Sequence, residues 1–207
     1  MSRLFNPANP VMQFIGKIGY SIFLNIIWFI CCIPIVTIGA STTALFHCTE
    51  RLVHDQYDGI IYEFFHSFKR NFKQATIIWL ILLAGGIVLG TDAYVLWRMH
   101  SENVFWTMIS AVFIIAAAGY AIIIMYVFPL LAHFDNTTFA MFKNSIMIGM
   151  RFLLCTVLMA LIYFGMGWLA INVFTPLIFL GMGSIALLCS YLLTNVFAQC
   201  ETPMEEA

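Results

Sequence analysis

The sequence predicts an all-α integral membrane protein, a polytopic helical bundle with about five transmembrane helices and one amphipathic helix at the membrane interface. Hydrophobic residues make up 62% of the 207 positions and charged residues only 9%, too little polar surface to coat a water-soluble domain. The charged residues are also confined to short stretches between long apolar blocks. Because backbone in lipid must satisfy its own hydrogen bonds and no alternating strand pattern occurs, we expect each block to be helical.

The apolar blocks set the number of spans. Four blocks lack Asp, Glu, Lys and Arg altogether, and a spanning helix needs about 20 apolar residues. The first three blocks have room for one span each, whereas the fourth has room for two and contains Pro176 where a helix would break. We therefore expect a single membrane domain covering residues 1–207. Its predicted spans are residues 18–46, 75–97, 104–132, 152–171 and 175–199.

The distribution of basic residues predicts the orientation of the chain. Lys and Arg gather between the first and second spans and again between the third and fourth, whereas the second connection holds only Arg98. The positive-inside rule then places Lys69 and Lys143 on the cytoplasmic side of the membrane.

The first block leaves the side of the N-terminus open. A single crossing would put Arg3 and Lys17 outside, against the positive-inside rule. Pro34 and Gly39 can break a helix, and a block that re-enters would return both basic residues to the cytoplasm. We predict a single crossing, because broken backbone inside a membrane must be buried in protein or line a wet cavity.

Residues 60–74 have the pattern of an amphipathic helix that lies in the membrane interface. Aromatic side chains recur there at helical spacing, and basic side chains occupy the other faces. The segment either positions the neighbouring span or binds anionic headgroups of the lipid bilayer through its basic end. The residues predicted to contact lipid are Phe65, Phe68, Lys69, Arg70, Phe72 and Lys73.

A short motif suggests an internal repeat. Residues 65–69 and 139–143 both read Phe-x-x-Phe-Lys, and each motif precedes a pair of predicted spans. The two copies would cover residues 60–131 and 134–199. An even number of crossings separates them, so this would be a parallel repeat, unlike the inverted repeats of many secondary transporters.

The first block also contains the segment that we predict to be functional. Its small and polar side chains would line a pocket between helices, or else pack helices together through local hydrogen bonds. The residues of this candidate segment are Asn25, Pro34, Thr37, Gly39, Ser41 and Thr42.

Few ionisable residues lie where they would carry chemistry. His47, Glu50 and His54 share one side of a helix, but a solvated polar face explains them better than a metal site. Asp92 lies near the far end of the second span, where an interfacial ion pair with Arg98 or His100 is expected. We expect no metal, no cofactor and no enzymatic activity, since no phosphate loop, nucleophile elbow or paired carboxylates occur. A net charge of −1 also argues against nucleic-acid binding.

Three segments resemble the YesL-like family of bacterial membrane proteins, a domain of unknown function numbered 624. They are the opening residues 5–10, residues 34–45 with the sequence PIVTIGASTTAL, and residues 68–75 with the sequence FKRNFKQA. The resemblance implies no catalytic residue. It implies a non-catalytic accessory or regulatory component associated with carbohydrate uptake, with a carbohydrate ABC transporter as partner. The alternative is a small transporter or permease-like subunit for a neutral solute.

Overall fold

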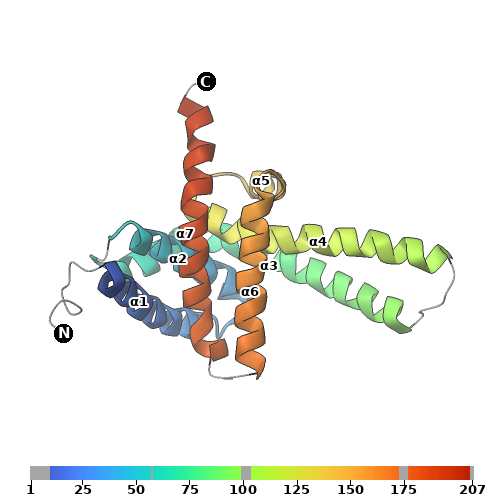
Figure 1. Cartoon of the computed structure of the whole chain (residues 1–207), viewed down its shortest axis with the longest axis horizontal. Coiled ribbons are helices and arrows are strands. Elements are labelled where there is room, and N and C mark those ends of the chain that lie inside the picture. The colour runs from blue at the N-terminus through green and yellow to red at the C-terminus, as the bar shows by residue number, and fades with distance from the viewer. Residues whose placement is uncertain (1–9, 57, 99–103, 173–176, 206–207) are drawn as a thin grey trace.

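A computed structural model of the chain describes residues 10–56, 58–98, 104–172 and 177–205 (Figure 1), and all secondary structure in them is helical. This confirms the all-α prediction. The elements are α1 (Pro10–Cys31), the short 3-10 helix η1 (Ile35–Thr37), α2 (Ile38–Val53), α3 (Ile60–Arg98), α4 (Val104–His133), α5 (Thr138–Arg151), α6 (Leu153–Asn172) and α7 (Leu177–Glu205).

Five of these helices are long and apolar enough to cross a membrane, so the protein is multi-pass, as predicted. Large apolar side chains cover much of their outer surface, and only 17–22% of the apolar window is buried in four of the five. Such exposure suits lipid as the solvent. The five candidate spans are Gln13–Cys31, Ile60–Arg98, Trp106–His133, Leu153–Asn172 and Gly181–Cys200.

The single helix predicted over residues 18–46 does not form. The first block is instead a helical hairpin in which α2 runs back along α1. Lys17 Nζ, near the start of α1, lies 3.1 Å from the carbonyl oxygen of Val53 at the end of α2. Halfway along, Trp28 Nε1 donates to Thr42 Oγ1 at 3.2 Å. The chain reverses because Pro34 has an extended backbone (φ −75°, ψ 119°) and no N–H with which to continue a helix.

Side chains of the turn and of α3 donate the hydrogen bonds that the backbone of the turn would otherwise lack. The Thr37 hydroxyl lies 2.6 Å from the carbonyl oxygens of both Cys31 and Pro34, and Trp79 Nε1 of α3 donates to the Ile35 carbonyl at 2.8 Å. The apolar side chain of Ile33 remains 73% exposed at the tip. Backbone breaks are tolerated in membranes only with such internal partners. Since 16 helical residues measure about 24 Å, α2 is shorter than a hydrocarbon core of about 30 Å. The hairpin therefore brings the chain back to the end at which α1 starts.

Helix α2 is the buried centre of the molecule. It packs against α3, α7, α4 and α1, and its residues 39–46 are all buried. Leu45 and Leu52 of α2 are fully buried, as are Tyr126 of α4 and Leu187 of α7, and all four belong to one hydrophobic core. A 16-residue helix with small residues on its surface can be enclosed in this way because neighbouring backbones approach it closely.

The amphipathic segment is not a separate interfacial helix. Residues 60–74 continue without a break into the predicted second span, and the two form the 39-residue helix α3. No Pro or Gly occurs between residues 60 and 84, so nothing in the chain would end the helix at Ala75. Phe65 and Phe72 are exposed, as lipid contact requires, whereas Phe68 is partly buried against the core.

The helices form three hairpins that share one polar end. The hairpins are α1–α2, α3–α4 and α6–α7, and Figure 1 shows the α3–α4 pair projecting as a long arm away from α6 and α7. Lys17 pairs with Asp55 at 2.9 Å, and Arg70 of α3 pairs with Asp135. Gln74 Nε2 donates to the Asn136 carbonyl at 2.6 Å. The ion pairs therefore join the start of α1 and the third turn of α3 to the connections that follow α2 and α4.

This arrangement changes the expected side of the N-terminus. Because α1 and α2 form a hairpin, Lys17 lies beside Asp55, at the end of α2 where Arg51 faces Glu63 near the start of α3. The positive-inside rule is then satisfied by the start of α1 as well. The parallel repeat of residues 60–131 and 134–199 stays a prediction. Its second copy differs from the first, because α5 ends at Phe152 before α6 begins.

Cysteine labelling tests this topology. In a background without native cysteines, Gln56→Cys, Lys69→Cys and Lys143→Cys should resist impermeant thiol reagents in intact cells and react after permeabilisation. Asp92→Cys should react in intact cells, because 22 residues of helix carry it about 33 Å beyond Arg70. Labelling of Gln56→Cys from outside would mean that the first block crosses the membrane once.

Candidate functional site

The hydroxyl groups of the predicted segment are engaged by nearby backbone. Ser41 Oγ donates to the Thr37 carbonyl at 2.9 Å, and Thr42 Oγ1 donates to the Ile38 carbonyl at 2.7 Å. Such bonds to the preceding turn are typical of hydroxyl side chains inside helices. These contacts favour the packing interpretation of the segment, and a functional role for it stays a prediction.

Asn25 lies apart from those hydroxyls, at the contact of α1 with α7. It is fully buried, and its Oδ1 accepts a hydrogen bond from the Gly183 backbone N–H at 2.8 Å. A Cβ atom on Gly183 would lie only 2.3 Å from the Ser21 carbonyl oxygen. The small residue at 183 therefore lets α7 approach α1 closely, and the Asn25 amide bridges the two helices.

Gly39 likewise permits a close approach of two helices, in this case of α2 to α3. A Cβ atom there would lie 2.5 Å from the Ala75 carbonyl oxygen and 2.7 Å from Trp79 Cβ. Pro34, Thr37 and Gly39 thus act together: they form the turn and seat the start of α2 on α3.

A polar pocket at the shared polar end is the chemically best equipped place among the described residues. It has a volume of about 320 Å³ and lies between the end of α2 and the end of α4. Glu50 Oε1 contacts His133 Nδ1, and His133 in turn stacks on Phe197 of α7 with ring centroids 4.6 Å apart. The pocket is lined by His47, Glu50, Arg51, His54, Gln56, Ala132 and His133.

The charges around this pocket are largely compensated. Glu63 of α3 lies 3.6 Å from both His47 Nε2 and Arg51 Nη1. The three residues grouped by the sequence pattern all line this pocket, but two of them have different partners: His47 faces Glu63, and Glu50 faces His133. In the described part of the chain, no three His, Cys, Asp or Glu side chains are placed to hold a metal ion.

No local sequence pattern pointed to His133 as the partner of Glu50, or to Glu63 as the partner of His47. His133 is 83 residues away from Glu50 along the chain, so only the packing of α4 on α2 brings them together. The expected pair of Asp92 with Arg98 does not form among the described residues, and His100 lies outside them. Arg98 Nε donates instead to the Tyr94 hydroxyl at 3.0 Å. Asp92 and Arg98 are six residues apart, so they lie about 120° apart around the helix axis. Tyr94 and Arg98 are four residues apart and are therefore neighbours on the helix surface.

Comparison with known proteins gives two matches. Residues 22–93, from the middle of α1 to near the end of α3, match the family described as "Protein of unknown function, DUF624". The chain is also 24% identical over 139 residues to "Uncharacterized protein YesL" of Bacillus subtilis (strain 168). That alignment covers 65% of this chain and 64% of the relative, so the chain spans less than two thirds of the relative's length. No solved structure matches the chain.

Proposed function

We propose that this chain, which matches the DUF624 family over residues 22–93 and is 24% identical to YesL over 139 residues, is a non-catalytic membrane accessory or regulatory protein of a carbohydrate uptake system. Its partner would be a carbohydrate ABC transporter in the bacterial cytoplasmic membrane. The matched region coincides with the α1–α2 hairpin and its seat on α3. Residues 34–45, the motif on which the resemblance rests, form the turn of the hairpin and pack α2 against its neighbours. This supports a structural role for that region.

An accessory role is favoured over a carrier because the buried polar side chains bond to each other between helices. Thr49 of α2 bonds to Ser190 of α7 at 2.9 Å, and Tyr126 of α4 bonds to Thr156 of α6 at 2.9 Å. A solute path needs polar groups that line a continuous wet route. Here the buried polar groups join helices to each other, and in the described residues only Ser21 Oγ and Arg51 Nε are buried side-chain atoms without a partner.

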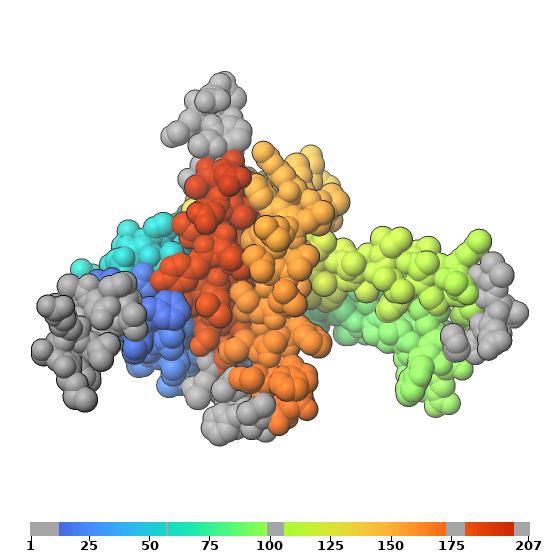
Figure 2. Space-filling model, in the orientation of Figure 1, coloured from blue at the N-terminus to red at the C-terminus, as the bar shows by residue number. Residues whose placement is uncertain are grey.

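The α3–α4 arm supplies a surface for a membrane partner. Figure 2 shows the arm standing clear of the rest of the molecule. Its two helices hold each other through Tyr120, whose hydroxyl donates to the Leu82 carbonyl at 2.7 Å. Val88 and Val112 on the arm are 58% and 68% exposed. Neighbouring transmembrane helices of another protein would pack on such side chains through close contact.

Co-purification and transport together test this proposal. The tagged chain should capture subunits of a carbohydrate ABC transporter from its own membranes, and deletion should reduce sugar uptake. The chain alone in liposomes should carry no sugar. Val88→Trp and Val112→Trp should weaken the capture, while the matched Val157→Trp on α6, 54% exposed, should not.

The alternative is a small carrier for a neutral solute, and the polar pocket at Glu50 and His133 favours it. Sugar uptake by liposomes that contain this chain alone would establish the alternative. Normal uptake after deletion, together with no captured transporter, would end the accessory proposal.

A further inference from the structure

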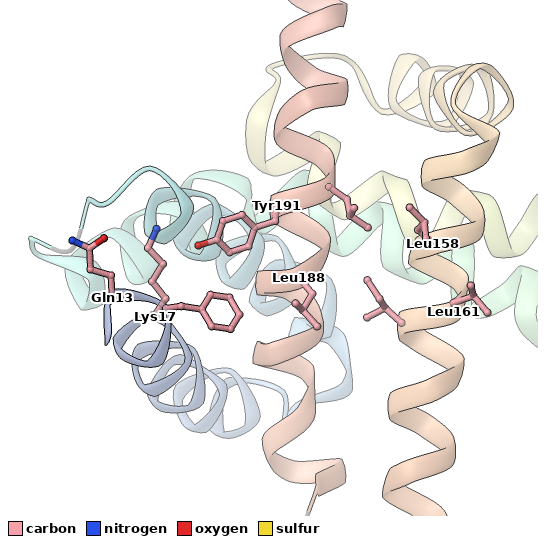
Figure 3. Close-up of a pocket in the computed structure, with 9 residues that line it drawn as sticks. Gln13, Lys17, Leu158, Leu161, Leu188 and Tyr191 are labelled. Carbon is pink, nitrogen blue, oxygen red and sulfur yellow. The ribbon is translucent and has the colours of Figure 1, made fainter. Parts of the chain in front are cut away.

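An apolar groove with a polar end crosses the face of α7. It has a volume of about 700 Å³ and lies between α1 and α6. Figure 3 shows Gln13 and Lys17 on α1 at one end, Leu158 and Leu161 on α6 at the other, and Tyr191 on α7 pointing toward Lys17. Leu161 is 60% exposed, so the groove is open at the surface that faces lipid.

The polar end contains a cation that the protein holds in place. The Lys17 side chain is only 8% exposed, and its Nζ lies 2.9 Å from Asp55 and 3.1 Å from the Val53 carbonyl. Its Asp55 partner is 61% exposed, so the carboxylate is hydrated while the ammonium group is enclosed. Lys17 Nζ also lies 5.5 Å from the ring centroid of Tyr191. Gln13 and Tyr191 also line this end of the groove, and the side chain of each carries a hydrogen-bond donor.

We propose that this groove binds a glycerophospholipid, with an acyl chain over the leucines of α6 and α7 and the phosphate at Gln13 and Tyr191, beside the enclosed Lys17 ammonium group. A phosphate offers only acceptor oxygens, which match the donors at this end. An acyl chain gains little by leaving the bilayer for an equally apolar groove, so selection must come from the polar end.

The size of the groove argues against a protein helix as occupant. A helix about 10 Å in diameter fills about 420 Å³ per turn, so the groove would hold fewer than two turns. A single flexible chain with a polar end fits this space better. The site lies apart from the α3–α4 arm, so it does not depend on the proposed accessory role.

Native mass spectrometry of the full chain tests the proposal. The protein is reconstituted in vesicles of equal parts phosphatidylglycerol and diacylglycerol and is then released in mild detergent. Diacylglycerol has the same acyl chains but lacks the phosphate. The wild type should retain phosphatidylglycerol over diacylglycerol by about tenfold, the effect of one charge-assisted hydrogen bond. Combined Gln13→Leu and Tyr191→Phe should remove most of that preference.

Filling the groove should remove the bound lipid itself. Leu161→Trp is the first variant, because its exposed position leaves folding intact, and Leu188→Trp blocks the groove from α7. Ile115→Trp, at a position 73% exposed on the arm, is the matched control and should retain lipid like the wild type. Equal retention of both lipids by the wild type, or equal retention by Leu161→Trp and Ile115→Trp, would overturn the proposal. A wild-type dimer that becomes a monomer in Leu161→Trp would also overturn it, because the groove would then join two copies of the chain.

Discussion

Replacing Gly39 with leucine should remove most of the folded protein from the membrane. The new side chain would meet the Ala75 carbonyl oxygen at 2.5 Å and Trp79 Cβ at 2.7 Å, and neither the α3 backbone nor a Cβ atom can swing aside. The overpacking should cost about 3 kcal/mol, which lowers the folding equilibrium more than about a hundredfold. The yield of monodisperse protein in mild detergent, and its thermal unfolding midpoint, measure the effect.

Gly90→Leu is the control for that experiment. It makes the same substitution in α3 at a position where no atom lies within 4 Å of an added Cβ, so folded yield should be unchanged or slightly higher. If Gly39→Leu protein folds normally but supports no sugar uptake, the segment has the functional role that the hydroxyl cluster suggested. Normal folding with normal uptake would remove both roles from Gly39.

Replacing Gly183 with leucine should separate α1 from α7. A Cβ atom at this position would lie 2.3 Å from the Ser21 carbonyl oxygen and 3.0 Å from Asn25 Cβ. The variant would also disturb the bond from the Gly183 N–H to Asn25 Oδ1, so the buried amide would lose one of its hydrogen bonds. We expect a loss of about 3 kcal/mol, with early proteolysis of α1.

A matched control lies two residues away on the same helix. The nearest atom to an added Cβ at Gly181 is the flexible Met166 methyl at 3.5 Å, so Gly181→Leu should leave α1 protected from protease. Equal protection in Gly183→Leu and Gly181→Leu would show that α1 does not dock on α7 through this contact.

Composition and block length alone determined the class of the molecule. With 62% hydrophobic residues and four charge-free blocks, the chain has no soluble alternative, and each block is long enough for its predicted number of helices. The separation of α6 from α7 and four of the five candidate spans followed from the same local information, whereas the first predicted span, residues 18–46, did not form as one helix. The basic residues, read with the positive-inside rule, predict a shared side for Lys69 and Lys143.

Only the tertiary structure decided how the first block is used. Pro34 indicated that a helix would bend, but a bend and a reversal have the same local pattern. The reversal depends on Trp79, which donates to the Ile35 carbonyl across 44 residues of sequence, and on Gly39 against Ala75. The pairing of Glu50 with His133 and the groove at Lys17 could not be predicted from the sequence either, because both depend on long-range contacts. Each joins helices that are distant along the chain, and the free energy that fixes their contacts comes from packing and not from local propensity.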